Sequence, residues 1–362
     1  MEECKRTALV LSGGGIRAML FHLGVLKYLA ECKSLEAIDR ISTVSGGSLL
    51  VGLIFKECGM RWPTSTEFLD SVLPGLRSKL CSRSLQWGAV RQMRPWQPQY
   101  LLTRANLLAL ALRREWGVTE SLSELPAGPE WSINGTTAES GRRFRFKRDS
   151  IGDYSLGYAT PGQYPLANAL AVSAAFPGGF GPLALDTSKF AWMKRDWGAP
   201  AENAKEVSIG FPMLHLYDGG VYDNLGLEPF FDAGKCMAKV DLRIVLSDAG
   251  APLQTEFDKR ALNPWRLKRV ADIMSEQSRA LRVRSFMNYL GKDSDYGAYI
   301  YIGFPAGQSG LVNGEQPAAF PTTLRRVHET EFDGLADHGY AVASSELSRQ
   351  KWQAHHVLPS IG

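Results

Sequence analysis

The first sixty residues alternate between short apolar runs and longer segments of helical periodicity. Residues 7–11 form an apolar run typical of a buried strand, and apolar positions at helical spacing follow from Ile16 to about Cys32. A second apolar run at 41–44 precedes another apolar helical segment at 49–58. This order of strand, helix, strand and helix predicts a parallel sheet covered by helices.

Beyond residue 58 the pattern changes. Residues 59–130 mix tryptophan, arginine and proline without a strand pattern, which predicts a helical cap inserted into the fold. Residues 186–212 are polar and are expected to form a surface flap. Apolar runs predict further strands at 131–136, 143–147, from 214, at 242–250 and at 298–304, and helices within 104–116, 166–183, 263–290 and 324–347. We expect a single domain over 1–362, with 257–362 as a C-terminal extension packed on it.

Composition and charge narrow the class of protein. The chain of 362 residues is 44% hydrophobic and 22% charged, which is ordinary for a globular protein. Its net charge of +4 is too small to indicate a nucleic-acid partner. Charged residues at 2–6 lead directly into the first strand, and no apolar run approaches the roughly 18 residues of a membrane span. We therefore expect a cytoplasmic protein, and the five scattered cysteines, with no C-x-x-C pair, give no support for a metal or redox site.

The loop after the first strand allows two interpretations. Gly13-x-Gly15-x-x-Ala18 fits the dinucleotide fingerprint, but the same N–H groups at a helix N-terminus can instead stabilise a reaction oxyanion. A dinucleotide site needs an acidic side chain at the end of the second strand, and this strand ends in Ser45. No Lys-Ser/Thr pair follows the glycines, so a phosphate-binding P-loop is also excluded. No cofactor is expected.

Ser45 lies between a strand and a helix, with Gly46 and Gly47 behind it. This arrangement is typical of a nucleophile elbow, a tight turn that projects the serine hydroxyl from the end of the sheet. Thr43 stands where the motif usually has its first glycine. The alternative is that Ser45 only caps the following helix. If it is a nucleophile, the two glycine-rich loops can share one site, because they leave neighbouring strands at the same end of the sheet.

A serine nucleophile needs a base, and two kinds are open. One is a histidine following an acid, in the order of α/β-hydrolases: Asp218 or Asp248 followed by His328 or His338. The other is direct activation by Asp218, which follows a strand and precedes two glycines. An elbow at residue 45 leaves room for only one strand before it, which disfavours the α/β-hydrolase order.

Five segments, in order, resemble the patatin-like phospholipase family, and in particular its bacterial type. They are "SGGGIRA" (12–18), "STVSGGS" (42–48), "AVSAAFPGGFGPL" (171–183), "DGGVYDNLGLEP" (218–229) and "SDAG" (247–250), and "INGTTAESGRRFRF" (133–146) resembles a strand pair of the same family. The resemblance covers about residues 7–250. It implies a three-layer α/β/α fold with a mainly parallel central sheet, decorated by the helical cap insertion.

The resemblance also implies site residues. Ser45 is then the nucleophile and Asp218 its base, in a Ser–Asp dyad without a catalytic histidine. The oxyanion hole is carried over to the loop Gly13, Gly14 and Gly15, supported by Arg17. The remaining residues expected to support the elbow and the turn are Gly46, Gly47, Gly219 and Gly220.

The implied function is hydrolysis of fatty-acyl esters of membrane lipids, as by a phospholipase A or lysophospholipase. Its substrate would be a phospholipid or another acyl lipid, reached by peripheral contact with a membrane. Basic stretches at 142–148, 259–269 and 279–284 are either contacts for lipid headgroups or solvated faces. Regions 85–116 and 186–197, which contain tryptophan, are better candidates for that contact. A histidine-containing carboxylesterase and a catalytically inert lipid-binding module are the alternatives.

Overall fold

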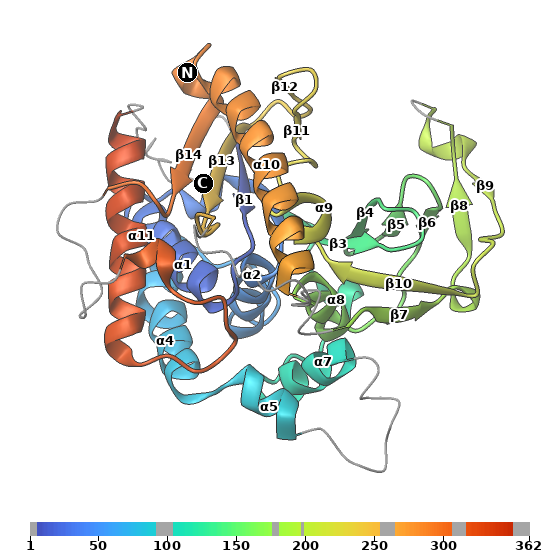
Figure 1. Ribbon diagram of the computed structural model, residues 1–362, viewed down its shortest axis with the longest axis horizontal. Helices are drawn as coiled ribbons and strands as arrows, with labels where there is room; N and C mark the ends of the chain where they lie inside the picture. The colour runs from blue at the N-terminus through green and yellow to red at the C-terminus, as the bar shows by residue number, and fades with distance from the viewer. Residues whose placement is uncertain are drawn as a thin grey trace, which may run out of the picture.

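The computed structural model describes residues 6–91, 104–175, 181–196, 199–253, 265–305 and 316–349 (Figure 1). Parts of the expected cap, of the loop within 171–183 and of the C-terminal extension lie outside these residues. No helix within the described ranges is both long enough and apolar enough to cross a membrane.

Five parallel strands form the centre of the main sheet. Their order is β14 (Gly297–Tyr301), β13 (Arg243–Asp248), β1 (Thr7–Leu11), β2 (Ile38–Thr43) and β3 (Glu130–Thr137). Every residue of β1 is buried, which explains its unbroken apolar run: a central parallel strand is covered on both faces.

Helices cover the two faces of this sheet and complete three layers (Figure 1). Leu9 and Leu11 of β1 belong to the larger core, while Ala8 and Val10 point to the opposite face and a smaller core. The larger core includes α1 (Gly15–Glu31), α2 (Gly46–Glu57), α8 (Leu166–Ser173) and α11 (Glu329–Arg349), and the smaller core includes the end of α10 (Trp265–Leu290). The α/β/α class predicted from the sequence is confirmed.

Helices predicted between residues 59 and 130 are present and pack beside this core. They are α3 (Ser65–Glu67), a π-helical turn (Phe68–Val72), α4 (Leu73–Ser82), α5 (Leu85–Arg91) and α7 (Arg104–Glu115). α4 packs against α2 and α11, and α7 packs against α8. Their buried leucines, such as Leu76 and Leu108, extend the larger core sideways.

An antiparallel extension continues the sheet beyond β3. It contains β4 (Arg143–Phe146), β5 (Ile151–Asp153), β6 (Gly157–Ala159), β8 (Trp192–Lys194) and β9 (Lys205–Glu206), and a second branch of β10 (Met213–Asp218) and β7 (Leu183–Asp186). A separate small hairpin pairs β11 (Phe231–Asp232) with β12 (Met237–Ala238). The expected flap at 186–212 therefore contributes two strands to the sheet. Four of their five residues are exposed, so no apolar alternation marked them in the sequence.

The topology brings the ends of β2 and β10 together. β2 runs parallel to β3 up to the pair Thr43–Ile133. β10 runs antiparallel to β3 and ends at the pair Asp218–Gly135. Because β4 occupies the other edge of β3 at these positions, β2 and β10 lie along the same edge and approach each other end to end. Ser45 follows shortly after the end of β2, and Asp218 is the last residue of β10.

Candidate active site

Ser45 sits in a strained turn between β2 and α2. Its backbone has φ 51° and ψ −118°, a conformation that costs a non-glycine residue about 1–3 kcal/mol. It is half-buried, whereas its neighbours on both sides are buried. Its side chain makes no capping hydrogen bond to α2, so the capping interpretation is wrong. The turn has the geometry of a nucleophile elbow.

Asp218 lies at the end of β10 and is buried. Its Oδ1 accepts a hydrogen bond from the Gly220 N–H at 2.6 Å, and its carboxylate interacts with the side chain of Ser45, an interaction that lowers its pKa. Burial raises the pKa of Asp218 to about 7, because an ionised carboxylate loses the solvation of water, and the interactions with Gly220 and Ser45 offset only part of this effect. A carboxylate that can exchange a proton near neutral pH therefore contacts the serine hydroxyl.

The glycine loop lies against this pair. Gly14 and Gly15 have φ of 146° and 59°, which side-chain-bearing residues rarely adopt, and a Cβ on Gly46 would overlap the carbonyl oxygen of Gly15. The Gly13 N–H already donates to the Asn224 carbonyl oxygen at 3.0 Å. The N–H groups of Gly14 and Gly15 have no acceptor among the described residues. Of the three predicted donors, two therefore have no acceptor of their own in the described part of the chain.

Arg17 holds this loop from behind. Its Nε donates to the Ala249 carbonyl oxygen at 3.1 Å, and its Nη1 donates to the Phe320 carbonyl oxygen at 2.6 Å. Burial lowers the pKa of Arg17 to about 10, and Asp248 nearby opposes this shift. The guanidinium is thus engaged by main-chain carbonyls, which fits the supporting position expected for it.

The remaining predicted glycines lie where the chain segments are closest. A Cβ on Gly47 would overlap the Leu11 carbonyl oxygen, and one on Gly219 would overlap that of Asn134. One on Gly220 would lie 2.7 Å from the Asn224 Oδ1. Side chains at these positions would push the two turns apart.

The histidines considered as bases lie elsewhere. His338 is buried with its Nε2 2.8 Å from the Ile302 carbonyl oxygen, and His328 is exposed. His22 donates from Nε2 to the Ser12 carbonyl oxygen at 3.0 Å and accepts at Nδ1 from the Ser247 hydroxyl at 2.7 Å. Burial lowers the pKa of His22 to about 4, so the ring is neutral and braces the glycine loop. None of the described histidines hydrogen-bonds to Ser45 or Asp218.

Asp248, the other acid considered, is fully buried in a separate cluster. It accepts a hydrogen bond from the Tyr299 hydroxyl at 2.8 Å and pairs with Arg279 at 2.9 Å. Its Oδ1 accepts from the Gly250 N–H at 2.8 Å. All these partners hold the end of β13, and Asp248 does not reach Ser45.

A chain of buried hydroxyls behind Ser45 was not predicted. The Ser45 N–H donates to the Ser173 Oγ at 3.1 Å, and the Ser173 hydroxyl donates to the Asn134 carbonyl oxygen at 2.7 Å. Ser173 therefore accepts from Ser48 at 2.8 Å, which in turn accepts from Thr43 at 2.7 Å. The chain begins at the Trp131 Nε1–H, which donates to the Thr43 hydroxyl at 2.9 Å. The threonine that departs from the elbow motif thus has a partner that glycine would lack.

Asn224 lies within the segment "DGGVYDNLGLEP" but was not among the site residues expected from the sequence. A Cβ on Gly13 would overlap the Asn224 carboxamide and would lie 3.2 Å from the Cβ of Ser45. The Asn224 side chain has no hydrogen-bond partner among the described residues. Its "DGGVYDN" spacing places it at the turn, but only the fold shows that it faces the serine.

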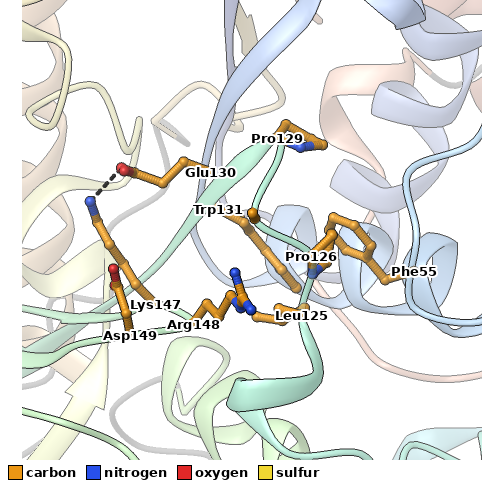
Figure 2. Close-up of a pocket in the computed structure, with 10 residues that line it drawn as sticks. Phe55, Leu125, Pro126, Pro129, Glu130, Trp131, Lys147, Arg148 and Asp149 are labelled. Carbon is orange, nitrogen blue, oxygen red and sulfur yellow. Dashed lines mark hydrogen bonds and ion pairs between the residues drawn. The ribbon is translucent and has the colours of Figure 1, made fainter.

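A small pocket lies at the other end of the sheet (Figure 2). Its volume is about 160 Å³, and it is formed where β3 begins, beside Phe55 of α2 and residues 147–149. Lys147 pairs with Glu130 across it, as the dashed line in Figure 2 shows. Neither Ser45 nor Asp218 lines this pocket. Among the described residues, no group of three or more His, Cys, Asp or Glu side chains is arranged to hold a metal ion.

Comparison with known proteins places this geometry in context. A family model described as patatin-like phospholipase matches residues 9–231, a range that includes the glycine loop, Ser45 and Asp218. The match is to the family as a whole and does not distinguish a bacterial type. No curated protein sequence gives a significant match.

Solved structures share the fold. Human GIVD cytosolic phospholipase A2 is 15% identical with a TM-score of 0.54, over 97% of this chain and 60% of that chain. Its complex with methyl gamma-linolenyl fluorophosphonate inhibitor and terbium chloride is 14% identical with a TM-score of 0.54, over 97% of this chain and 59% of that chain. This chain thus spans about 60% of the length of these structures.

Proposed function

Because the chain belongs to the patatin-like phospholipase family, we propose that it is a serine lipid acyl hydrolase that uses Ser45 and Asp218. The observation that carries the proposal is the interaction of the Ser45 side chain, on a strained elbow, with the buried carboxylate of Asp218. A serine hydroxyl is a weak nucleophile unless a neighbouring base removes its proton, and Asp218 is the only base within its reach among the described residues.

The reaction begins when Asp218 takes the hydroxyl proton and the Ser45 Oγ attacks the ester carbonyl. The carbonyl oxygen becomes an oxyanion, which accepts hydrogen bonds from the open N–H groups of Gly14 and Gly15. The N-termini of α1 and α2 both meet this point, and their dipoles favour the developing negative charge.

Collapse of the tetrahedral intermediate breaks the ester bond, and the departing alcohol takes the proton from Asp218. Water then attacks the acyl-enzyme while Asp218 removes one of its protons. A second collapse releases the fatty acid and returns that proton to Ser45. A carboxylate in water is too weak a base for this cycle, so the pKa of about 7 that burial gives Asp218 favours both transfers.

The substrate class follows from the family. We propose a phospholipid or related acyl lipid, approached by peripheral contact with a membrane surface. One solved structure of the human cytosolic phospholipase A2 of similar fold is a complex with a fluorophosphonate inhibitor. The Asn224 carboxamide, which lies beside Ser45, would bond the polar part of this substrate.

Fluorophosphonate labelling tests the proposal. The wild-type protein should be labelled and should hydrolyse a soluble chromogenic acyl ester. Ser45→Ala should abolish both, and Asp218→Asn should lower turnover by at least ~100-fold. Ser82→Ala, which removes an exposed serine from the end of α4, serves as the control and should change neither.

Other outcomes would favour the alternatives. Full turnover by Asp218→Asn together with its loss in His338→Ala would indicate a histidine-dependent esterase. A folded wild-type protein that neither labels nor hydrolyses esters would indicate an inert lipid-binding module.

A further inference from the structure

Helix α10 extends past the edge of the sheet at which the candidate site lies. Its last turns are buried in the smaller core through Phe286, Tyr289 and Leu290. Asp248 is the last residue of β13, so its ion pair with Arg279 places Arg279 level with that edge of the sheet. The residues before 279 therefore lie beyond the sheet, and at ~1.5 Å per residue the described part from 269 adds about 15 Å (Figure 1).

The part of α10 before its buried last turns carries an exposed apolar stripe. Val270 is 54% exposed, Met274 68% and Leu281 61%, and Ile273 on the same side is 40% exposed. Val270 lies three residues before Ile273 and four before Met274, and Leu281 lies seven after Met274, so the four lie on one side of the helix, which the exposed Gln277 interrupts. No residue from 269 to 285 is buried, so nothing among the described residues packs on this face. We call these four residues the α10 stripe.

The charged side chains of the helix are arranged around the stripe. Arg284 is exposed one helical turn beyond Leu281, and Arg269 lies one turn before Ile273. Glu276 is turned away from the stripe into an ion pair with Arg279 at 3.0 Å. An apolar face with basic residues at its two ends matches a surface of apolar chains beneath anionic headgroups.

The stripe is also close to the candidate site. Arg282, the neighbour of Leu281, donates from Nη2 to the Tyr222 carbonyl oxygen at 3.2 Å. Tyr222 belongs to α9 (Gly220–Asp223), the short helix that directly follows Asp218 and the Gly219 turn. Val221 of the same helix is 54% exposed. The helix that carries the stripe therefore contacts the segment that directly follows Asp218.

From these observations we propose that the α10 stripe is the lipid-docking surface of this protein and that it seats on anionic bilayers. A second copy of the chain fits less well, because a standard protein interface uses roughly 20–30 residues on each side and the stripe is one narrow helix face. The inference rests on the proposed function only for the purpose of docking, which is to bring the enzyme to its lipid substrate. Docking itself does not require catalysis.

Vesicle co-sedimentation tests the surface separately from the chemistry. Ser45→Ala protein should bind vesicles of phosphatidylcholine with 30% phosphatidylglycerol without digesting them. Adding Met274→Glu and Leu281→Glu should lower the partition coefficient by at least ~10-fold, because two charges would enter the apolar layer. In protein that keeps Ser45, the same two changes should leave hydrolysis of a soluble ester unaltered.

Trp87→Glu is the matched comparison, since Trp87 is a 61% exposed apolar residue on α5, within the region 85–116 that the sequence offered as a competing membrane contact. It should leave vesicle binding intact. Equal loss in this comparison variant, or unchanged binding by the α10 variant, would place docking elsewhere and overturn the inference. So would a wild-type dimer in light scattering that the α10 changes convert to monomer. If only ester hydrolysis failed, the proposed function would be contradicted, but the vesicle-binding result could still be interpreted.

Discussion

At the scale of single residues, the environment of each group decides its chemistry. Asp218 and Asp248 are both buried aspartates at strand ends. Asp248 faces Arg279 and Tyr299, whereas among the described residues the Asp218 carboxylate interacts only with the Ser45 side chain and a backbone N–H. Without a cation, burial dominates at Asp218 and raises its pKa to about 7.

The raised pKa of Asp218 predicts how activity depends on pH. The base must be ionised, so kcat/KM for a soluble ester should be constant above pH about 8 and fall about tenfold per unit below pH about 6. A rate profile from pH 4 to 9, measured under conditions where the protein stays folded, checks this. A profile that is level down to pH 5 would contradict Asp218 as the base with this pKa.

Ser173 offers a test of the hydroxyl chain. Ser173→Ala removes the acceptor of the Ser45 N–H, so the strained turn loses a contact that helps to hold it. We expect kcat to fall about tenfold, the equivalent of one hydrogen bond, with KM nearly unchanged. Ser132→Ala is the control, because this buried hydroxyl bonds to the Asn134 side chain and not to Ser45. A loss of stability with kcat unchanged would show that Ser173 only packs.

At the scale of elements, two helix N-termini and two turns share one small volume. α1 begins at Gly15 and α2 at Gly46, and these residues are in backbone contact. Neither helix starts with a side-chain cap. The Ile16 N–H donates to the Thr323 carbonyl oxygen at 2.9 Å, whereas the Gly15 N–H, the first of α1, has no acceptor among the described residues. The missing caps make this end of the sheet suited to an anion.

Arg17 fixes α1 in this position and gives the element-scale prediction. Arg17→Lys keeps a charge but cannot reach both the Ala249 and Phe320 carbonyl oxygens in the same geometry. We expect a fall of more than tenfold in kcat and a cost of about 1–3 kcal/mol in the free energy of unfolding. The control is Arg77→Lys, because Arg77 bonds to Glu329 and Asp333 on the surface. If Arg17→Lys kept the wild-type kcat, Arg17 would not be needed to support the site.

At the scale of the whole molecule, the C-terminal helix completes the core on which the site rests. α11 packs along α1 although about 300 residues separate them in sequence. The contact is close at two glycines: a Cβ on Gly24 would overlap the Ala336 carbonyl oxygen, and one on Gly339 would overlap that of Phe21. The family match ends at residue 231, so this support lies outside it.

Gly339→Val tests the dependence of the whole fold on this contact. Its side chain would separate α11 from α1, and overpacking of this kind costs about 1–3 kcal/mol. Urea unfolding should show a lower midpoint. Asp337→Val, at an exposed position of the same helix, is the control for the change in helix propensity. Equal midpoints for the two variants would show that α1 and α11 can separate without cost.

The sequence by itself determined what depends on neighbouring residues. An unbroken apolar run predicts β1, and Ser45 followed by two glycines between a strand and a helix predicts the elbow, because strand burial and tight turns are local patterns. The fold class followed from the order of such elements. Residues 192–194 and 205–206 were missed as strands because their exposed positions have no apolar alternation.

Only the tertiary structure decided which groups meet and which donors are free. β10 reaches Ser45 because it shares an edge of β3 with β2, which no spacing in the sequence encodes. The Gly13 N–H is occupied by Asn224, 211 residues away, and Ser173 bonds to Ser45 across 128 residues. The pKa of Asp218 likewise depends on burial by distant segments. Long-range packing sets these properties, so the residue types alone could not give them.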